Sequence, residues 1–262
     1  SEVGHLNIGA GRIVYQDLVR ISKDCTDNTI EKNQVIVNAF SYAKDNNKAV
    51  HFIGLVSDGG VHSLDTHLYK LCDITAGYGL KDVFVHALTD GRDTDPKSGL
   101  EYLKKLQNHL DKSNGKIASV CGRYYAMDRD NRLERVKEAY EMLVNGIGKK
   151  AINALDAINE SYQAEVTDEF IKPVVIVNKE GNPIGKIKEG DVVFCFNFRT
   201  DRLRELTIAL TQRNISEFGM KPLPLHYLTM ARYDDKFANV HVVYEKDNLV
   251  IKRKFDLGKQ LA

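Results

Sequence analysis

Four loops of this chain contain histidine or arginine side chains directly after an apolar, strand-like run. Arginine stays protonated at neutral pH, and its planar guanidinium can donate paired hydrogen bonds to a carboxylate or a phosphate. Such side chains, recurring in loops of one kind, favour a binding site for a small polyanion. The candidate residues are His62, Arg92, Asp93, Arg123, Arg129, Arg199 and Arg202.

These candidates follow a common layout in the sequence. Each apolar run leads into a loop rich in turn residues, and apolar residues then recur at helical spacing. The order strand, loop, helix therefore occurs four times. The runs and their loops are 50–56 with SDGGVHS, 83–88 with TDGRDTDP, 116–121 with GRYYAMDRDNR, and 191–196 with NFRTDRLR.

This order predicts an α/β fold with a mostly parallel sheet and helices on both faces. Parallel strands need crossover connections, and the helices between the runs supply them. In such sheets, ligands bind beyond the carboxyl ends of the strands. We therefore expect the four loops to meet at one edge of the sheet, although they lie far apart in the sequence.

The remaining segments predict further elements around this sheet. The helix after the first loop is expected over 63–78, with Ser63 as its N-cap. Two apolar runs, 173–177 and 184–187, flank KEGNP and predict a small hairpin insertion. Additional helices are expected within 14–46 and 149–170, and additional strands at 223–230 and 238–244.

Composition narrows the class of partner. The chain has 262 residues, a formal net charge of +1 and no long apolar run, which gives no reason to expect nucleic acid or a membrane. The phosphate-binding patterns GxGxxG and GxxxxGK[ST] are absent, so we expect a ligand smaller than a nucleotide. The four cysteines have no metal-site spacing and predict buried thiols in a cytoplasmic protein.

Each arginine could instead neutralise a carboxylate beside it. Arg129 lies between Asp128 and Asp130, and Asp201 has an arginine on either side. The recurrence in four loops favours a shared site over four separate ion pairs. Histidines outside the first loop are expected to be structural or surface residues.

Five motifs in this chain, taken in order, closely resemble the 2,3-bisphosphoglycerate-independent phosphoglycerate mutases: SEVGHLNIGAGR, SDGGVHS, TDGRDT, GRYYAMDRDNR and FNFRTDR. The resemblance implies interconversion of 3-phosphoglycerate and 2-phosphoglycerate through a phosphoserine. It also implies a phosphatase-like domain with two divalent metal ions, usually manganese, into which a transferase domain is inserted. By this resemblance, 1–13 is a stub of the phosphatase-like domain, 14–250 the inserted domain, and 251–262 the returning junction.

The same resemblance implies residue roles. Ser1 would be the nucleophile and a metal ligand, and the other metal ligands would lie outside this chain. The seven loop residues listed above would hold the substrate. We therefore expect the chain alone to bind no metal and to be inactive without the phosphatase-like domain of the same polypeptide. One departure is Leu64, where the family commonly has a second histidine.

Two alternatives remain open on the sequence. The chain could be a noncatalytic binding module for a small phosphorylated metabolite. It could also be an amino-terminal nucleophile hydrolase, with Ser1 attacking an amide. Replacement of Ser1 distinguishes them, because binding by a module would not need it.

Overall fold

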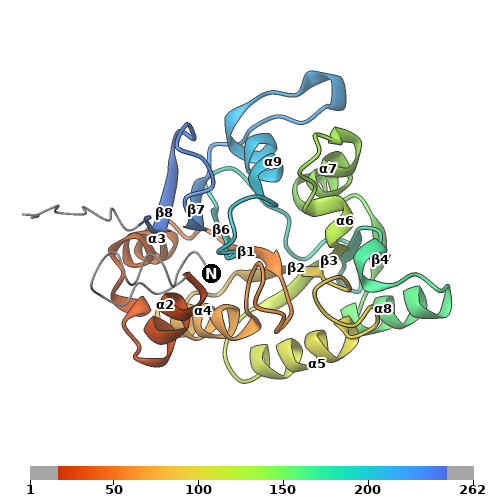
Figure 1. The fold of residues 1–262 in the computed structure, drawn as a ribbon, viewed down its shortest axis with the longest axis horizontal. Coiled ribbons are helices and arrows are strands. Elements are labelled where there is room, and N and C mark those ends of the chain that lie inside the picture. The colour runs from red at the N-terminus through yellow and green to blue at the C-terminus, as the bar shows by residue number, and fades with distance from the viewer. Residues whose placement is uncertain (1–16, 247–262) are drawn as a thin grey trace, which may run out of the picture.

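The computed structural model describes residues 17–246, in which one eight-stranded sheet has helices on both faces (Figure 1). The strand order is β4-β5-β3-β2-β1-β6-β7-β8. All neighbouring strands pair in parallel except β3 and β5, which are antiparallel. The strands are β1 Val50–Leu55, β2 Val83–Thr89, β3 Lys116–Gly122, β4 Lys149–Ala151, β5 Val174–Ile176, β6 Val192–Cys195, β7 His226–Ala231 and β8 Val240–Tyr244.

Helices form two layers, one on each face of the sheet. Figure 1 shows α4, α5 and α8 along one face and α6, α7 and α9 along the other. Two π-helical segments, Glu141–Asn145 and Ile208–Gln212, continue α7 and α9. The helices are α2 Asp17–Thr26, α3 Gln34–Asp45, α4 Asp65–Gly77, α5 Gly99–Leu110, α6 Arg123–Ala126, α7 Leu133–Tyr140, α8 Ala154–Gln163 and α9 Arg204–Thr207.

The core divides into two apolar clusters, one on each side of the sheet. Strand β1 contributes to both, because successive side chains of a strand point to opposite faces. Val50 and Phe52 pack in the cluster that contains residues of α3, α4 and α5, whereas Ile53 and Leu55 pack in the cluster beneath α7 and α9. Every residue of β1 is buried, which explains its continuous apolar sequence.

The fold class is the one that the sequence predicts, and the four predicted strands of the parallel sheet are β1, β2, β3 and β6. The hairpin turn is also present, since Val177 pairs with Pro183 in an antiparallel bridge. Its first arm is β5, which joins the main sheet beside β3. The prediction for Ser63 is wrong. Its hydroxyl donates to the carbonyl oxygen of Leu55, and α4 begins at Asp65 without a side-chain cap.

The sheet changes direction of winding at β1. Strands β2 and β3 lie on one side of it, and β6, β7 and β8 lie on the other. The connections after β1 and β6 therefore lead to α4 on one face of the sheet and to α9 on the other (Figure 1). Open α/β sheets bind ligands beyond the carboxyl ends of such a strand pair. Within residues 17–246, no helix is long and apolar enough to cross a membrane.

Candidate anion-binding site

Arg123 stands at the centre of the loop edge. It is the first residue of α6, directly after β3, and only 4% of it is exposed. Its Nη1 donates to Asp90 at 2.7 Å and to Asp93 at 2.6 Å, and its Nη2 lies 2.9 Å from Nε2 of His62. Burial alone would lower the pKa of Arg123, but its hydrogen bonds to these two carboxylates outweigh burial and raise that pKa. One buried cation thus joins the first, second and third loops.

The second loop is shaped by Asp90. Its Oδ1 accepts hydrogen bonds from the backbone N–H groups of Arg92 and Asp93. Gly91, which lies between Asp90 and Arg92, has a φ of +67°. Oδ2 of Asp90 accepts the hydroxyl of Ser57 at 2.7 Å. Burial alone would raise the pKa of Asp90, but these hydrogen bonds and Arg123 lower it below the ordinary value. Asp90 is therefore a fixed anion that anchors the turn.

His62 connects the first loop to the fourth. Its carbonyl oxygen accepts from the N–H groups of Phe198 and Arg199 at 2.8 Å and 3.2 Å. Since Arg123 can only donate, Nε2 of His62 is the acceptor and the ring proton is assigned to Nδ1. Burial, followed by the charge of Arg123, lowers the pKa of His62 to about 4. The ring is therefore a neutral donor at physiological pH.

Asp201 contacts one arginine of the third loop and one of the fourth loop. It lies 3.1 Å from Nε of Arg199 and 3.3 Å from Nη1 of Arg129. Its Oδ1, the oxygen that faces Arg199, is 3.9 Å from Nδ1 of His62, and that buried nitrogen lacks a hydrogen-bond partner among the described residues. Nε of Arg202 is also buried without a partner there. Unpaired polar atoms of this kind suit a site that completes its hydrogen bonds with a ligand.

The arginines of this edge divide by exposure. Arg123 is buried, but the side chains of Arg92, Arg129 and Arg199 are 55%, 48% and 47% exposed. Arg92 lies at the rim, with its Nη1 3.6 Å from Glu169. Burial, and then the charges of Arg129 and Arg123, lower the pKa of Arg202, which indicates that these guanidinium groups share one electrostatic environment.

The structure thus brings together the histidine, the aspartate and the arginines that the sequence predicts for substrate binding. Ser1 lies outside the described residues. The alternative that each arginine neutralises a carboxylate beside it in the sequence holds only in part. Arg129 contacts Asp201 of the fourth loop, and Arg92 contacts Glu169. The role of Asp90 was not predicted, although the Asp-Gly pair at 90–91 is a recognisable turn signal. Nothing in the sequence distinguishes Asp201 from a carboxylate that only neutralises the arginines beside it.

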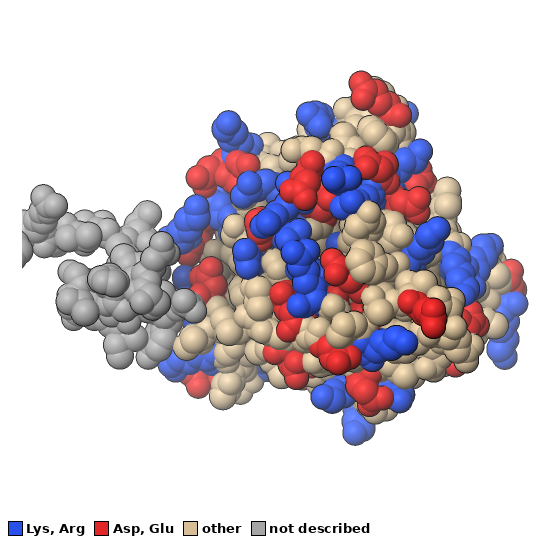
Figure 2. All heavy atoms as spheres, turned by 45° about the vertical axis from the view of Figure 1, so that its right-hand side comes forward, with Lys and Arg blue, Asp and Glu red and all other residues tan. Residues whose placement is uncertain are grey.

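Metal ligation has no basis in the described part of the chain. Residues 17–246 contain no group of three or more histidine, cysteine, aspartate or glutamate side chains placed to hold an ion. On the face shown in Figure 2, basic and acidic side chains are interspersed. The loop edge instead offers the guanidinium groups of Arg92, Arg129 and Arg199, which can bind and orient an anion.

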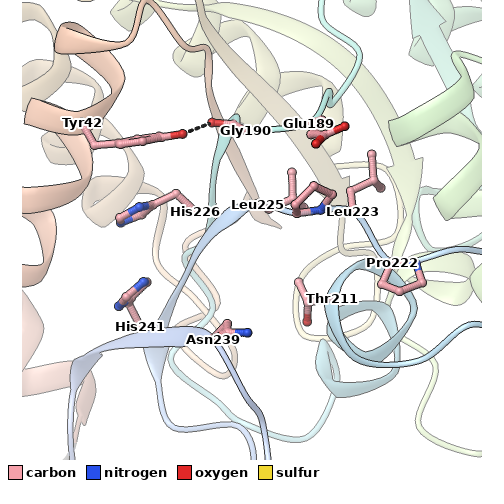
Figure 3. A pocket seen from close by; sticks show the side chains of 11 residues that line it. Tyr42, Glu189, Gly190, Thr211, Pro222, Leu223, Leu225, His226, Asn239 and His241 are labelled. Atoms are coloured by element: carbon pink, nitrogen blue, oxygen red, sulfur yellow. Dashed lines mark hydrogen bonds between the residues drawn. The ribbon is translucent and has the colours of Figure 1, made fainter.

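Two hollows lie away from this edge. The larger, of about 600 Å³, is at the opposite end of the sheet, where β6, β7 and β8 begin (Figure 3). There the rings of Tyr42, His226 and His241 stack, and the Tyr42 hydroxyl donates to the Gly190 carbonyl. The second, of about 450 Å³, is lined by residues of α7 and the segments around 147–149 and 172–173. The predicted binding residues line neither.

Comparison with known families agrees with the motifs. The model of the family described as "BPG-independent PGAM N-terminus" matches residues 21–235. The chain belongs to this family. It is 59% identical over its whole length to a 2,3-bisphosphoglycerate-independent phosphoglycerate mutase of Bacteroides fragilis, and 57% identical over 95% of its length to that of Flavobacterium johnsoniae. It covers 51% and 49% of those proteins, so the chain spans about half the length of these curated relatives.

A solved structure supports the same assignment. The chain resembles the structure titled as Leishmania mexicana phosphoglycerate mutase at low cobalt concentration, with a TM-score of 0.80 and 32% sequence identity. The match covers 89% of this chain and 44% of that one. The α/β fold described above is therefore the fold of this half of a known mutase.

Proposed function

We propose that this chain is the substrate-holding transferase domain of a 2,3-bisphosphoglycerate-independent phosphoglycerate mutase. The complete polypeptide would interconvert 3-phosphoglycerate and 2-phosphoglycerate. The observation that supports this most strongly is the convergence of His62, Arg123 and Asp201 with the outer arginines at one sheet edge. These residues offer several cationic donors and a neutral imidazole to a small, highly charged ligand.

The proposed roles follow from exposure and contacts. Arg92, Arg129, Arg199 and Arg202 would bind the carboxylate and phosphate of the substrate, because their guanidinium groups reach solvent or have a free donor. His62 would donate its Nδ1 proton to a substrate oxygen. Arg123 and Asp93 would hold that imidazole in place and complete the pocket wall.

The chemistry itself would need the other half of the polypeptide. Under this proposal Ser1 would accept the phosphoryl group, and two divalent metal ions, usually manganese in this family by resemblance, would supply charge stabilisation in the phosphatase-like domain. The inserted domain would keep the glycerate bound and oriented while its phosphoryl group is on the serine. Residues 14–250 would form that domain, with 1–13 and 251–262 as junctions, in a cytoplasmic enzyme.

The proposal is tested with the full-length polypeptide loaded with manganese. We expect interconversion of the two phosphoglycerates, and loss of one charge-assisted hydrogen bond in Arg199→Ala should weaken substrate binding by about 1.5–3 kcal/mol, which is roughly 10–150-fold. Arg213→Ala is the matched control, since Arg213 is exposed and lies after α9, away from the loop edge. Absence of turnover by the intact, metal-loaded polypeptide would contradict the proposal.

Calorimetry with this chain alone separates the alternatives. Saturable binding of 3-phosphoglycerate, weakened by Arg199→Ala and absent for a hexose phosphate, is expected for a substrate-holding domain. Replacement of Ser1 should leave that binding intact while abolishing turnover in the full-length polypeptide. A noncatalytic module would show the same binding and no turnover in any context.

A further inference from the structure

Two buried carboxyl groups lie beneath the loop that contains Arg129. Asp128 is 4% exposed and comes from the loop itself, whereas Glu205 is 8% exposed and comes from the first turn of α9. The two carboxyl groups lie within hydrogen-bonding reach of each other once one of them holds a proton. They therefore join the third loop to the helix that follows the fourth loop.

These carboxyl groups accept three successive backbone N–H groups. Oδ2 of Asp128 accepts from Asp130 and Arg132, both at 2.9 Å, and Oε1 of Glu205 accepts from Asn131 at 2.8 Å. Asn131 has a φ of +56°, a conformation that a residue with a side chain adopts at some energetic cost. The carboxyl pair thus fixes this turn, and within residues 17–246 these three N–H groups have no other acceptor.

The pair can share one proton. Oε2 of Glu205 is buried without a donor facing it, so a proton there would let it donate to Asp128. Burial, with smaller effects from Asp128 and Asp130, raises the pKa of Glu205 to about 7. Arg135, 3.2 Å from Oδ1, and the backbone N–H groups keep Asp128 ionised. A neutral Glu205 beside an ionised Asp128 satisfies both side chains.

We infer that the Asp128–Glu205 pair is a positioning device for Arg129 in substrate binding. Arg129 lies between Asp128 and the three clamped N–H groups, and its half-exposed guanidinium contacts Asp201 of the fourth loop. A shift of this turn would move the guanidinium away from the ligand that it shares with Arg199. This inference rests on the proposed function for the identity of that ligand, but the clamp itself is a property of the fold.

The clamp is tested directly by amide hydrogen exchange in this chain. Glu205→Ala removes the acceptor of the Asn131 N–H and should increase its exchange rate at least tenfold. Glu205→Gln should not, because an amide can accept from Asn131 and donate to Asp128 as a protonated carboxyl does. Glu134→Ala, an exposed glutamate in the first turn of α7, is the matched control. Unchanged exchange at Asn131 in Glu205→Ala would overturn the inference whatever the enzyme does.

Kinetics of the full-length polypeptide test the link to Arg129. We expect Glu205→Ala to raise the KM for 3-phosphoglycerate about tenfold, whereas Glu205→Gln and Glu134→Ala stay within twofold of the unaltered protein. In an Arg129→Ala background, Glu205→Ala should add little, because two residues that act through one contact are not additive. An undiminished tenfold effect in that background would overturn the positioning role. Absence of turnover in the unaltered polypeptide, with the exchange result intact, would instead refute the proposed function.

Discussion

A buried chain of hydrogen bonds runs through β3, β2 and β1 and ends at Asp191, directly before β6. The Ser119 hydroxyl lies 2.7 Å from Nδ1 of His86, Nε2 of His86 lies 2.9 Å from Nδ1 of His51, and Nε2 of His51 lies 3.2 Å from Asp191. Asp191 can only accept when ionised, so every donor points the same way and both imidazoles are neutral. Burial, and then the neighbouring His51, lowers the pKa of His86 well below its ordinary value.

The neutral state of His86 makes the stability of the fold depend on pH. Below about pH 6.5 the unfolded chain binds a proton at this histidine and the folded chain does not. The free energy of unfolding should therefore fall by about 1.4 kcal/mol per pH unit for this one residue as the pH decreases. The loss continues until the folded pKa is reached.

Replacement of His86 by glutamine separates the hydrogen bond from the titration. The amide can still donate to His51 but leaves the Ser119 hydroxyl without its acceptor, which should cost about 1–3 kcal/mol at pH 8. Because the variant cannot take up the proton, its stability should decline less steeply below pH 6.5. With a deficit of about 2 kcal/mol, the two profiles should meet about 1.5 pH units lower, near pH 5.

The assay is urea unfolding of this chain, followed by circular dichroism at half-unit steps from pH 5 to pH 8. Ser119→Ala is the matched control, since it removes the same hydrogen bond but keeps the imidazole. Its profile should lie below that of the unaltered chain and parallel to it. If the profile of His86→Gln also ran parallel to that of the unaltered chain, His86 would titrate alike in the folded and unfolded states, which would refute the predicted pH dependence.

Two further predictions concern packing and thiol chemistry. A methyl group at Gly122 would meet the carbonyl of Glu169, so Gly122→Ala should lower the free energy of unfolding by about 1–3 kcal/mol; an unchanged urea midpoint would contradict the fit. Burial raises the pKa values of Cys72, Cys121 and Cys195, and that of Cys195 reaches about 12. These thiols should therefore not react with a disulfide reagent at pH 8 until urea unfolds the chain. Rapid labelling of any of them in the folded chain would show that the core is more accessible than the structure indicates.

The sequence was sufficient to predict the parallel sheet and the meeting of the four loops at one of its edges. Buried strands such as β1 and β6 have continuous apolar sequences, and the rule that ligands bind beyond carboxyl ends then places their loops together. This is why His62 and Arg199 could be assigned to one site across more than a hundred intervening residues. Ion pairs between these arginines and carboxylates were also expected from the sequence, but the partner of each arginine could not be predicted.

Partners set by tertiary packing were not predictable in this way. Ser63 has the right residue type and position for an N-cap, yet its hydroxyl bonds to Leu55 because the loop turns back over the end of β1. His51 and His86 each lie alone in an apolar run, and nothing in the sequence shows that parallel pairing of β1 with β2 brings their rings together. Pairings of this kind depend on strand register, which local pattern does not specify.

Under the proposed function, the division between one buried and several exposed arginines would give the second domain a role in substrate binding. Arg123 has its hydrogen bonds satisfied within the fold, so it shapes the site more than it attracts a ligand. The exposed guanidinium groups face water, where two unit charges 4 Å apart attract by only about 1 kcal/mol. If the phosphatase-like half closes over this edge and excludes water, an effective dielectric constant near 20 raises each such attraction to about 4 kcal/mol. Tight substrate binding and closure would then be one event, and binding by the isolated chain would be weak and sensitive to salt.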